Sequence, residues 1–275
     1  MIRIEREGAI AVVVMDNPPV NAASQPLRKA LLDAVREIDA DAAIAAAVLT
    51  GAGRGFMGGA DIREFDRPPL APQLPEVIAA LMDSPKPWIA AIHGAALGGG
   101  LELALGCDVR IAAVDAVVGL PEVTLGIIPG AGGTQHLPRL VGIPRAIDFI
   151  CSARRLTAQE AFVARIVDEV VRDGLRGAAV KLAGVMKSKH RIRDLPIHKV
   201  DVKAIRAAEE AALAASSGRQ IIEAIASIKR SAAMPYAQAL QREREAFLAL
   251  RASPEAARLR RKFFEARSAA KGAPR

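Results

Sequence analysis

Residues 89–134 read IAAIHGAALGGGLELALGCDVRIAAVDAVVGLPEVTLGIIPGAGGT, and the rest of the chain is organised around this stretch. It holds two glycine-rich turns, at 98–100 and 130–133, and each turn lies close to one glutamate in otherwise apolar sequence. Glu102 follows the first turn, and Glu122 precedes the second. A carboxylate is costly to remove from water unless it is paired or has a chemical role. These two glutamates are therefore the first candidates for catalysis.

Short apolar runs and helical runs alternate on either side of this stretch. Apolar residues in 27–38 follow a helical period, and residues 75–82 and 101–105 predict further short helices. Runs of apolar residues bounded by Gly, Pro, Asp or Asn are typical of buried strands. The alternation predicts an α/β protein. The predicted strands are 10–15, 45–50, 88–92, 108–112 and 117–119, with a last strand at 166–171.

The last third of the chain is rich in Ala, Lys and Arg and has a helical period throughout. We place a boundary within residues 189–196. It divides the chain into a core that holds the active site, residues 1–190, and a helical C-terminal region, residues 191–275. The helices expected after residue 172 are 178–186, 202–215, 220–232, 236–251 and 254–267.

Composition limits the class of protein. The 275 residues are 51% hydrophobic and 25% charged, which is enough apolar sequence for a large core. We expect no membrane association, because no run approaches the about 20 apolar residues of a membrane span. The start lacks a signal or transit pattern, and Cys107 and Cys151 are expected to be reduced thiols, so we expect a cytoplasmic location. The charge of +8 could attract nucleic acid, but with 3% aromatic residues we expect no nucleic-acid partner.

The first glycine turn allows three interpretations. A helix that begins there offers unpaired N–H groups and a positive dipole end, which favours the anionic form of Glu102. Such a helix start could also stabilise a phosphate or a developing enolate. A tight packing turn followed by an exposed glutamate is the plain alternative. A dinucleotide fingerprint is the third, but the spacing GAALGGG does not follow G-x-G-x-x-G.

Residues 52–62 (AGRGFMGGADI) form another glycine-rich turn after a predicted strand. The backbone N–H of Ala60 could be a second donor, and two donors that converge on one oxygen make an oxyanion hole. A flexible loop is the alternative interpretation of this turn. For Glu122, the alternative is a side chain that caps the local backbone or is exposed. His93 and His136 lack a Ser/Asp or Cys partner pattern, so we assign neither a catalytic role. No residue cluster has the spacing of a metal site, so no metal is expected.

Together these motifs resemble the crotonase, or enoyl-CoA hydratase/isomerase, superfamily. The C-terminal part resembles the hydratase/isomerase half of peroxisomal and bacterial bifunctional β-oxidation enzymes, and the resemblance extends over residues 10–271. In those relatives an NAD-dependent dehydrogenase half follows, and we expect that second activity to be absent from this chain. The matching pieces are NPPVNA (17–22), GADI (59–62), ALGGGLELA (96–104), LPE (120–122), GTQ (133–135), PY (235–236), EREAFLAL (243–250), SP (253–254) and FFEAR (263–267).

The resemblance implies a spiral of ββα units with a helical C-terminal region, and an enoyl-CoA hydratase of fatty acid β-oxidation. The expected reaction is syn addition of water to 2-trans-enoyl-CoA, which gives 3-hydroxyacyl-CoA. The N–H groups of Ala60 and Gly99 would bind the thioester oxygen. Glu102 would activate the water that attacks C3, and Glu122 would supply the proton at C2. Isomerisation of 3-enoyl-CoA is expected as a further activity, while an isomerase only, a CoA-thioester hydrolase and an RNA-binding homologue stay open.

The resemblance also places the substrate. The turn at Ala22 and the side chain of Arg63 would contact the CoA nucleotide, together with the neighbouring Asp61 and Ile62, and Gly130 would lie on the Glu122 side of the pocket. CoA belongs to the substrate, so no separate cofactor is expected. A homotrimer or a hexamer is usual in the family, whereas the bifunctional relatives are monomeric.

Three positions depart from the family pattern without removing a catalytic group. Met57 and Gly58 replace a pair of small residues, often Ser-Ala, which could alter the width of the pocket or the stiffness of the loop. His136 replaces a common Arg after Thr-Gln. Arg165 occupies the place of a helix-ending glycine, where a left-handed conformation would cost about 1 kcal/mol.

Overall fold

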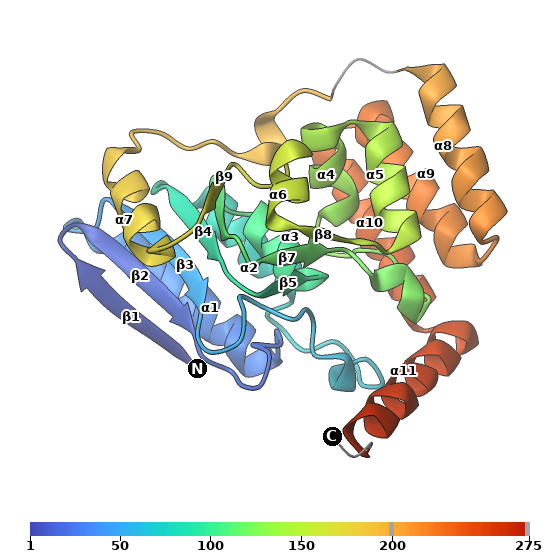
Figure 1. Cartoon of the computed structure of the whole chain (residues 1–275), viewed down its shortest axis with the longest axis horizontal. Helices are drawn as coiled ribbons and strands as arrows, with labels where there is room; N and C mark the ends of the chain where they lie inside the picture. Colours follow the sequence, from blue (N-terminus) through green and yellow to red (C-terminus); the bar gives the residue numbers. More distant parts are fainter. Residues whose placement is uncertain (198–200, 273–275) are drawn as a thin grey trace.

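The structure of the chain, a computed structural model, describes residues 1–197 and 201–272, apart from the side chains of residues 267–272. Figure 1 shows the strands and the early helices on one side of the molecule and the C-terminal helices on the other. The region of strands supplies the glycine turns, and the helical region closes over them.

The larger sheet has six strands in the order β1-β2-β3-β4-β6-β9. Only β1 is antiparallel to its neighbour, and the other pairs are parallel. The predictions for 10–15 and 88–92 are confirmed with the same bounds, but only the last three residues of 166–171 form a strand. The strand bounds are β1 Ile2–Glu7, β2 Ile10–Met15, β3 Ala46–Gly51, β4 Trp88–Ile92, β6 Val109–Ala113 and β9 Glu169–Val171.

A second, smaller sheet lies beside the first and consists of β5 (Ala95–Leu97), β7 (Val117–Gly119) and β8 (Arg155–Thr157). β4 continues into β5 and then into α3 (Gly99–Leu105), and β6 continues into β7 and then into η2 (Glu122–Leu125). Each unit therefore adds one strand to each sheet and then a helical turn. This repetition is the predicted spiral of ββα units.

The predicted helices are confirmed, those at 202–215 and 236–251 with the same bounds and the others with different ends. Thr157 and Glu160 form the capping box that the sequence pattern TAQE indicates. α4 was not predicted, because it begins inside a glycine turn and contains Pro138. The bounds are α1 Gln25–Ala40, η1 Ile62–Glu64, α2 Leu74–Asp83, α4 Gly133–Val141, α5 Ile143–Ser152, α6 Ala158–Val163, α7 Leu175–Val185, η3 Ile192–Asp194, α8 Val202–Ala215, α9 Arg219–Ala233, α10 Tyr236–Arg251 and α11 Pro254–Gly272.

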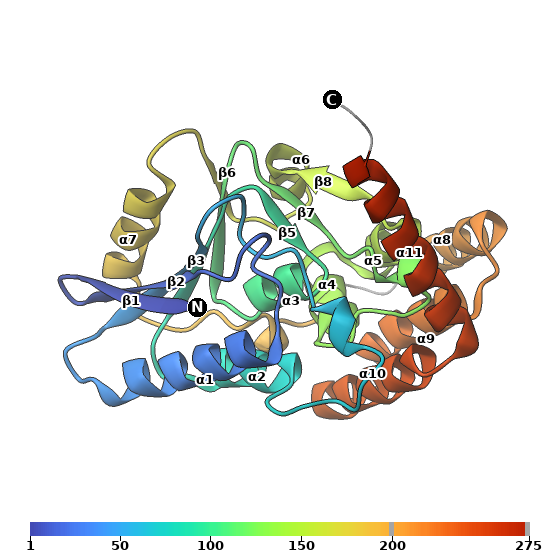
Figure 2. The same cartoon turned by 90° about the horizontal axis from the view of Figure 1, so that it is seen from below.

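The C-terminal helices return to the loop that carries η1, and Figure 2 shows α11 alongside it. The buried guanidinium of Arg251 donates hydrogen bonds to the backbone carbonyls of Glu64, Phe65 and Arg67. Arg260 of α11 donates to Asp66 of the same loop. The predicted boundary near residue 190 stays a prediction, but residues beyond it hold a loop of the N-terminal core in place.

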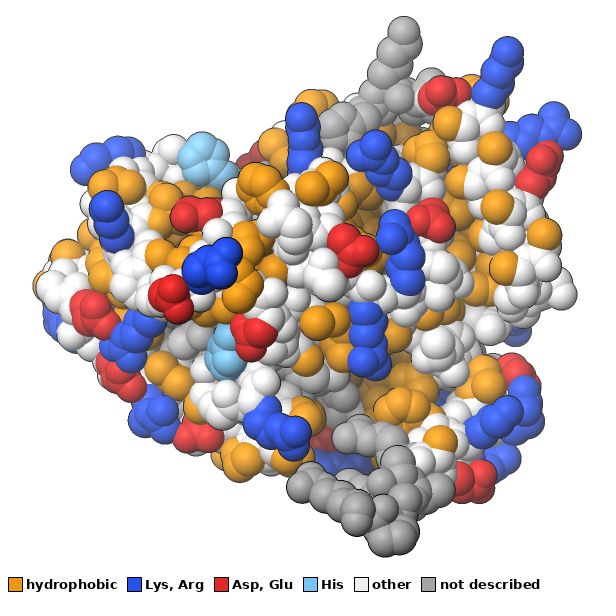
Figure 3. All heavy atoms as spheres, viewed as in Figure 1, with side chains coloured by type: hydrophobic (Ala, Val, Ile, Leu, Met, Phe, Trp, Pro, Cys, Tyr) orange, Lys and Arg blue, Asp and Glu red, His pale blue; other side chains and the backbone are white. Residues whose placement is uncertain are grey.

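The surface carries both signs of charge. On the face drawn in Figure 3, Lys and Arg side chains lie among Asp and Glu side chains and form no continuous stripe. Across the described ranges, no helix is both long and apolar enough to cross a membrane.

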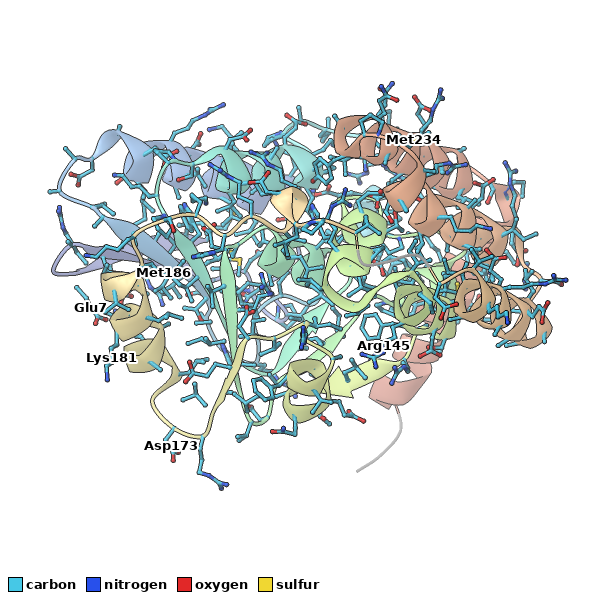
Figure 4. All side chains as sticks on the ribbon, turned by 90° about the horizontal axis from the view of Figure 1, so that it is seen from above. Glu7, Arg145, Asp173, Lys181, Met186 and Met234 are labelled. Atoms are coloured by element: carbon cyan, nitrogen blue, oxygen red, sulfur yellow. The ribbon has the colours of Figure 1, made fainter. Side chains whose placement is uncertain are left out.

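The central parallel strands β2, β3 and β4 are buried on both faces, which explains their unbroken apolar sequence. Side chains of β2 alternate between two layers. Val13 faces the layer built by α1 and α2, whereas Val12 faces α7. Ala179 and Ala183 of α7 complete the second layer, and the ion pairs of Arg176 with β1 hold α7 in place. Figure 4 shows the labelled Glu7 of β1 next to α7.

Candidate active site

One cavity of about 1140 Å³ is lined by every residue that the sequence analysis assigned to a site. Residues from the smaller sheet, from the loop with η1 and from α10 and α11 share its wall. The structure thus brings together segments that lie far apart in the chain. The nine predicted residues are Ala22, Ala60, Asp61, Ile62, Arg63, Gly99, Glu102, Glu122 and Gly130.

Two backbone N–H groups meet where the first glycine turn passes the loop before η1. Gly99 is the first residue of α3, so its N–H has no acceptor inside the helix. A Cβ atom built on Gly99 would lie 3.5 Å from the backbone nitrogen of Ala60. The turns need glycine at Gly59 and Gly98, whose φ angles are 107° and 53°. Two donors therefore lie side by side on the cavity wall.

Glu102 points at the second glycine turn. Its side chain is buried, and Oε1 accepts hydrogen bonds from the backbone N–H groups of Ala131 at 2.7 Å and Gly133 at 2.9 Å. Burial raises the pKa of Glu102, while these two amides act in the opposite direction. The expected dipole effect, which favours the anionic form, is therefore outweighed by desolvation. The alternative of an exposed glutamate is wrong.

Glu122 begins η2 and is buried against the first glycine turn. A Cβ atom on Gly98 would lie 3.0 Å from Glu122 Oε1. Its Oε2 has no hydrogen-bond partner in the described part of the chain. Burial, and next the charge of Glu102, raise the pKa of Glu122 well above its ordinary value. The two glutamates therefore interact electrostatically but have different surroundings.

A third buried glutamate, Glu243 of α10, completes the group, and the sequence analysis did not assign it to the site. Its carboxylate accepts hydrogen bonds from the N–H groups of Gly132 at 2.6 Å and Thr134 at 2.9 Å. Burial, followed by the charge of Glu102, raises the pKa of Glu243 to about 8. The sequence contained a signal for this residue, because Glu243 lies on the apolar, buried face of α10 between Ala239 and Phe247.

The predicted substrate-binding residues lie at the rim and the wall of the cavity. The side chain of Arg63 is 77% exposed and donates through Nε and Nη2 to the carboxylate of Asp61. The hydrogen bond from Arg63 lowers the pKa of Asp61. Gly130 has no room for a side chain, because the ring of Phe247 packs against it. The roles of these residues toward CoA stay predictions.

The three departures from the family pattern have local explanations. Met57 is buried and forms an isolated parallel bridge with Ala96, so its side chain fills core space. His136 is buried with Nε2 2.7 Å from the hydroxyl of Tyr236, and desolvation lowers its pKa to about 3. Arg165 has a φ of 62°, which confirms the left-handed conformation. Among the residues that the structure describes, no group of three or more His, Cys, Asp or Glu side chains could hold a metal ion.

Comparison with known proteins gives one consistent result. The family model described as enoyl-CoA hydratase/isomerase matches residues 5–220. The peroxisomal bifunctional enzymes of Danio rerio and Homo sapiens are each 38% identical to this chain over 96% of its length, and the chain spans only 38% of either protein. An enoyl-CoA hydratase subunit from Geobacillus kaustophilus has a TM-score of 0.63 at 33% identity and covers 100% of this chain and 96% of its own. An enoyl-CoA hydratase from Bacillus anthracis has a TM-score of 0.64 at 32% identity, with 90% of this chain and 89% of its own covered.

Proposed function

The chain belongs to the enoyl-CoA hydratase/isomerase family, and from this premise we propose that it is an enoyl-CoA hydratase. In the proposed reaction, water adds syn to a 2-trans-enoyl-CoA to give a 3-hydroxyacyl-CoA. The named relatives and the arrangement of the cavity support this reaction.

The proposed oxyanion hole consists of the N–H groups of Ala60 and Gly99. Attack of water at C3 moves negative charge onto the thioester oxygen, and donors that are already aligned stabilise that charge. The support is geometric, since the two amides lie side by side on the wall of the cavity that contains Glu102 and Glu122.

The difference between the two glutamates is the single observation that carries the proposal. Glu102 accepts two hydrogen bonds from backbone amides, which favour its anionic form. Oε2 of Glu122 accepts none from the described residues, and the charge of Glu102 raises the pKa of Glu122 further. Paired groups with diverging pKa values are suited to act as base and acid. Glu102 is therefore the proposed base, and Glu122 is the proposed acid.

The proposed proton movements follow from this difference. Both hydrogen bonds from the backbone amides are accepted by Oε1 of Glu102, so Oε2 is the oxygen that a water could contact. Glu102 would take a proton from that water as oxygen bonds to C3, and Glu122 would give its proton to C2 as the enolate collapses. The two proton transfers leave the sum of charges on the pair unchanged.

Apolar and basic side chains both line the cavity. Leu125, Ile127, Phe247 and the pair Phe263–Phe264 offer apolar surface for an acyl chain. Side chains of arginine at the same cavity could bind phosphate groups of CoA, since guanidinium binds phosphate through paired hydrogen bonds. These arginines are Arg54, Arg63, Arg67 and Arg155.

Isomerisation of a 3-enoyl-CoA is a second candidate, and the free Oε2 of Glu122 favours it. A carboxyl group with an unoccupied oxygen could move a proton between C4 and C2 of the same substrate. Binding of RNA has less support, because Lys and Arg are interspersed with acidic side chains on the face drawn in Figure 3.

The direct test is hydration of crotonyl-CoA by the purified chain, followed by the same measurement with medium- and long-chain enoyl-CoA. We expect formation of the 3-hydroxyacyl product. Release of free CoA without hydration would instead show a thioester hydrolase, and conversion of 3-enoyl-CoA without any hydration would show an isomerase only. Binding of RNA would have to persist at physiological salt, because phosphate attraction weakens steeply as salt rises.

A further inference from the structure

The four backbone amides of the turn 131–134 are divided between two buried carboxylates. Ala131 and Gly133 donate to Glu102, and the amides that alternate with them donate to Glu243. The turn is also the start of α4, a helix of nine residues whose N-cap Gly132 has a φ of 108°. Glu102 and Glu243 thus come from different regions of the chain and hold the same turn.

This sharing links the positions of the two side chains. A peptide unit is rigid, so the direction of one N–H group limits the direction of the next. Hydrogen bonds between a carboxylate and backbone N–H groups are short and directional. A displacement of Glu243 would rotate the peptide units at Gly132 and Thr134 and so redirect the donors that hold Glu102.

The cost of burying Glu243 indicates a purpose beyond packing. The residue is fully buried in α10, where a leucine would fill the apolar stripe without loss of hydration. Its carboxylate is instead joined to a chain of hydroxyls, with Thr134 Oγ1 2.5 Å away and Ser227 Oγ 2.7 Å beyond that atom. Each of these polar groups lies inside the protein and is bonded.

We propose that Glu243 is a positioning residue for the hydration reaction, which orients Glu102 through the shared amides of the turn 131–134. This inference rests on the proposed function for its kinetic consequence, but the contact itself does not depend on it. Glu243 makes no proposed contact with the substrate.

Charged and titratable groups from three elements interact electrostatically with Glu243. Glu102 of α3 and Glu122 of η2 are the nearest acids by their effect on pKa values, and Arg244 and Tyr236 share α10 with it. From α4 the facing group is the uncharged hydroxyl of Thr134. Above its pKa of about 8 Glu243 is ionised and its charge raises the pKa of Glu122, so in that pH range removal of the charge lowers the pKa of Glu122. A role in packing alone would not change the ionisation of Glu122.

The test compares Glu243→Gln with Glu245→Gln. Both variants replace a glutamate of α10 by its amide, but Glu245 is exposed and bonds only with Gln241 and Arg242 of the same helix among the described residues. For Glu243→Gln we expect kcat to fall roughly 10- to 100-fold with KM within about twofold, because misplaced catalytic groups lose rate. We also expect the alkaline limb of the kcat profile to move to lower pH. Glu245→Gln should match the wild type in both measurements.

A second measurement does not require activity. Hydrogen exchange of the amides of 131–134 should be faster in Glu243→Gln than in the wild type, and unchanged in Glu245→Gln. If the wild type hydrates no enoyl-CoA, the proposed function fails, and the exchange result still tests the positioning contact.

Glu243→Asp serves if the glutamine variant does not fold, because it keeps the charge and withdraws the carboxylate by one methylene. A lower kcat with faster exchange at the turn supports the proposal. A folded variant with wild-type kcat, pH profile and exchange at the turn would overturn it.

Discussion

Glu102 and Glu243 bind alternate amides of the same turn, residues 131–134. One side chain comes from the strand-rich core and the other from the C-terminal helices. The proposed base is therefore held by a turn that the core alone does not hold. The helical region is part of the site and not an appendage to it.

Replacement of either proposed catalytic glutamate should abolish most of the activity. We expect Glu102→Gln and Glu122→Gln each to lower the rate of crotonyl-CoA hydration by at least about 100-fold. The first variant loses the base that accepts a proton from the attacking water, and the second loses the acid that protonates C2. Steady-state kinetics on both variants measure this effect. Glu37→Gln, an exposed site on α1, is the control. Near-normal turnover in either active-site variant would refute the assignment of that glutamate.

A side chain at Gly99 should damage the proposed oxyanion hole. The added Cβ atom would lie 2.6 Å from Leu74 Cδ2, so Gly99→Ala must shift the start of α3 or its neighbour. Loss of one aligned donor costs about 100- to 1000-fold in kcat. Gly177→Ala in α7 is the control, because a Cβ atom there meets no described atom within 4 Å. If Gly99→Ala keeps wild-type kcat, this amide does not stabilise the thioester oxygen.

Arg251 should contribute to both stability and substrate binding. Its guanidinium donates to three carbonyls of the loop 64–67, which lines the cavity. We expect Arg251→Met to lower the free energy of unfolding by about 1–3 kcal/mol, since part-buried carbonyls lose a charged donor, and to raise KM. Urea denaturation and steady-state kinetics measure the two effects. Arg258→Met, which removes an exposed pair with Glu255, should leave both unchanged.

The buried His136 should make the folded state less stable at acidic pH. Desolvation lowers its pKa from 6.5 to about 3, so between these pH values the unfolded chain binds a proton that the folded chain does not. The free energy of unfolding therefore falls as pH decreases from about 6.5 to 3. His136→Gln keeps a polar group near Tyr236 but cannot titrate. Urea denaturation at several pH values should show that the free energy of unfolding falls less with decreasing pH in the variant than in the wild type. The same dependence on pH in both proteins would contradict this prediction.

Much of the fold was predictable from local sequence. Strand 10–15 and helix 236–251 have the expected bounds, because each carries a continuous apolar run or a helical period long enough to be recognised. β1, β5 and β8 were not predicted, although β7, which is as short as β5 and β8, was. α4 was missed because its glycine start and its internal proline argue against a helix at the level of sequence.

The sequence by itself determined the members of the candidate site, namely two glutamates and two glycine turns with the spacing of a known family. Only the tertiary structure decided that the second glycine turn holds Glu102 and that Glu243 reaches the same turn from α10. The reason is physical. Strand and helix patterns depend on residues that are neighbours in the chain, whereas the hydrogen-bond partners and the pKa of a buried carboxylate depend on whichever segments pack around it.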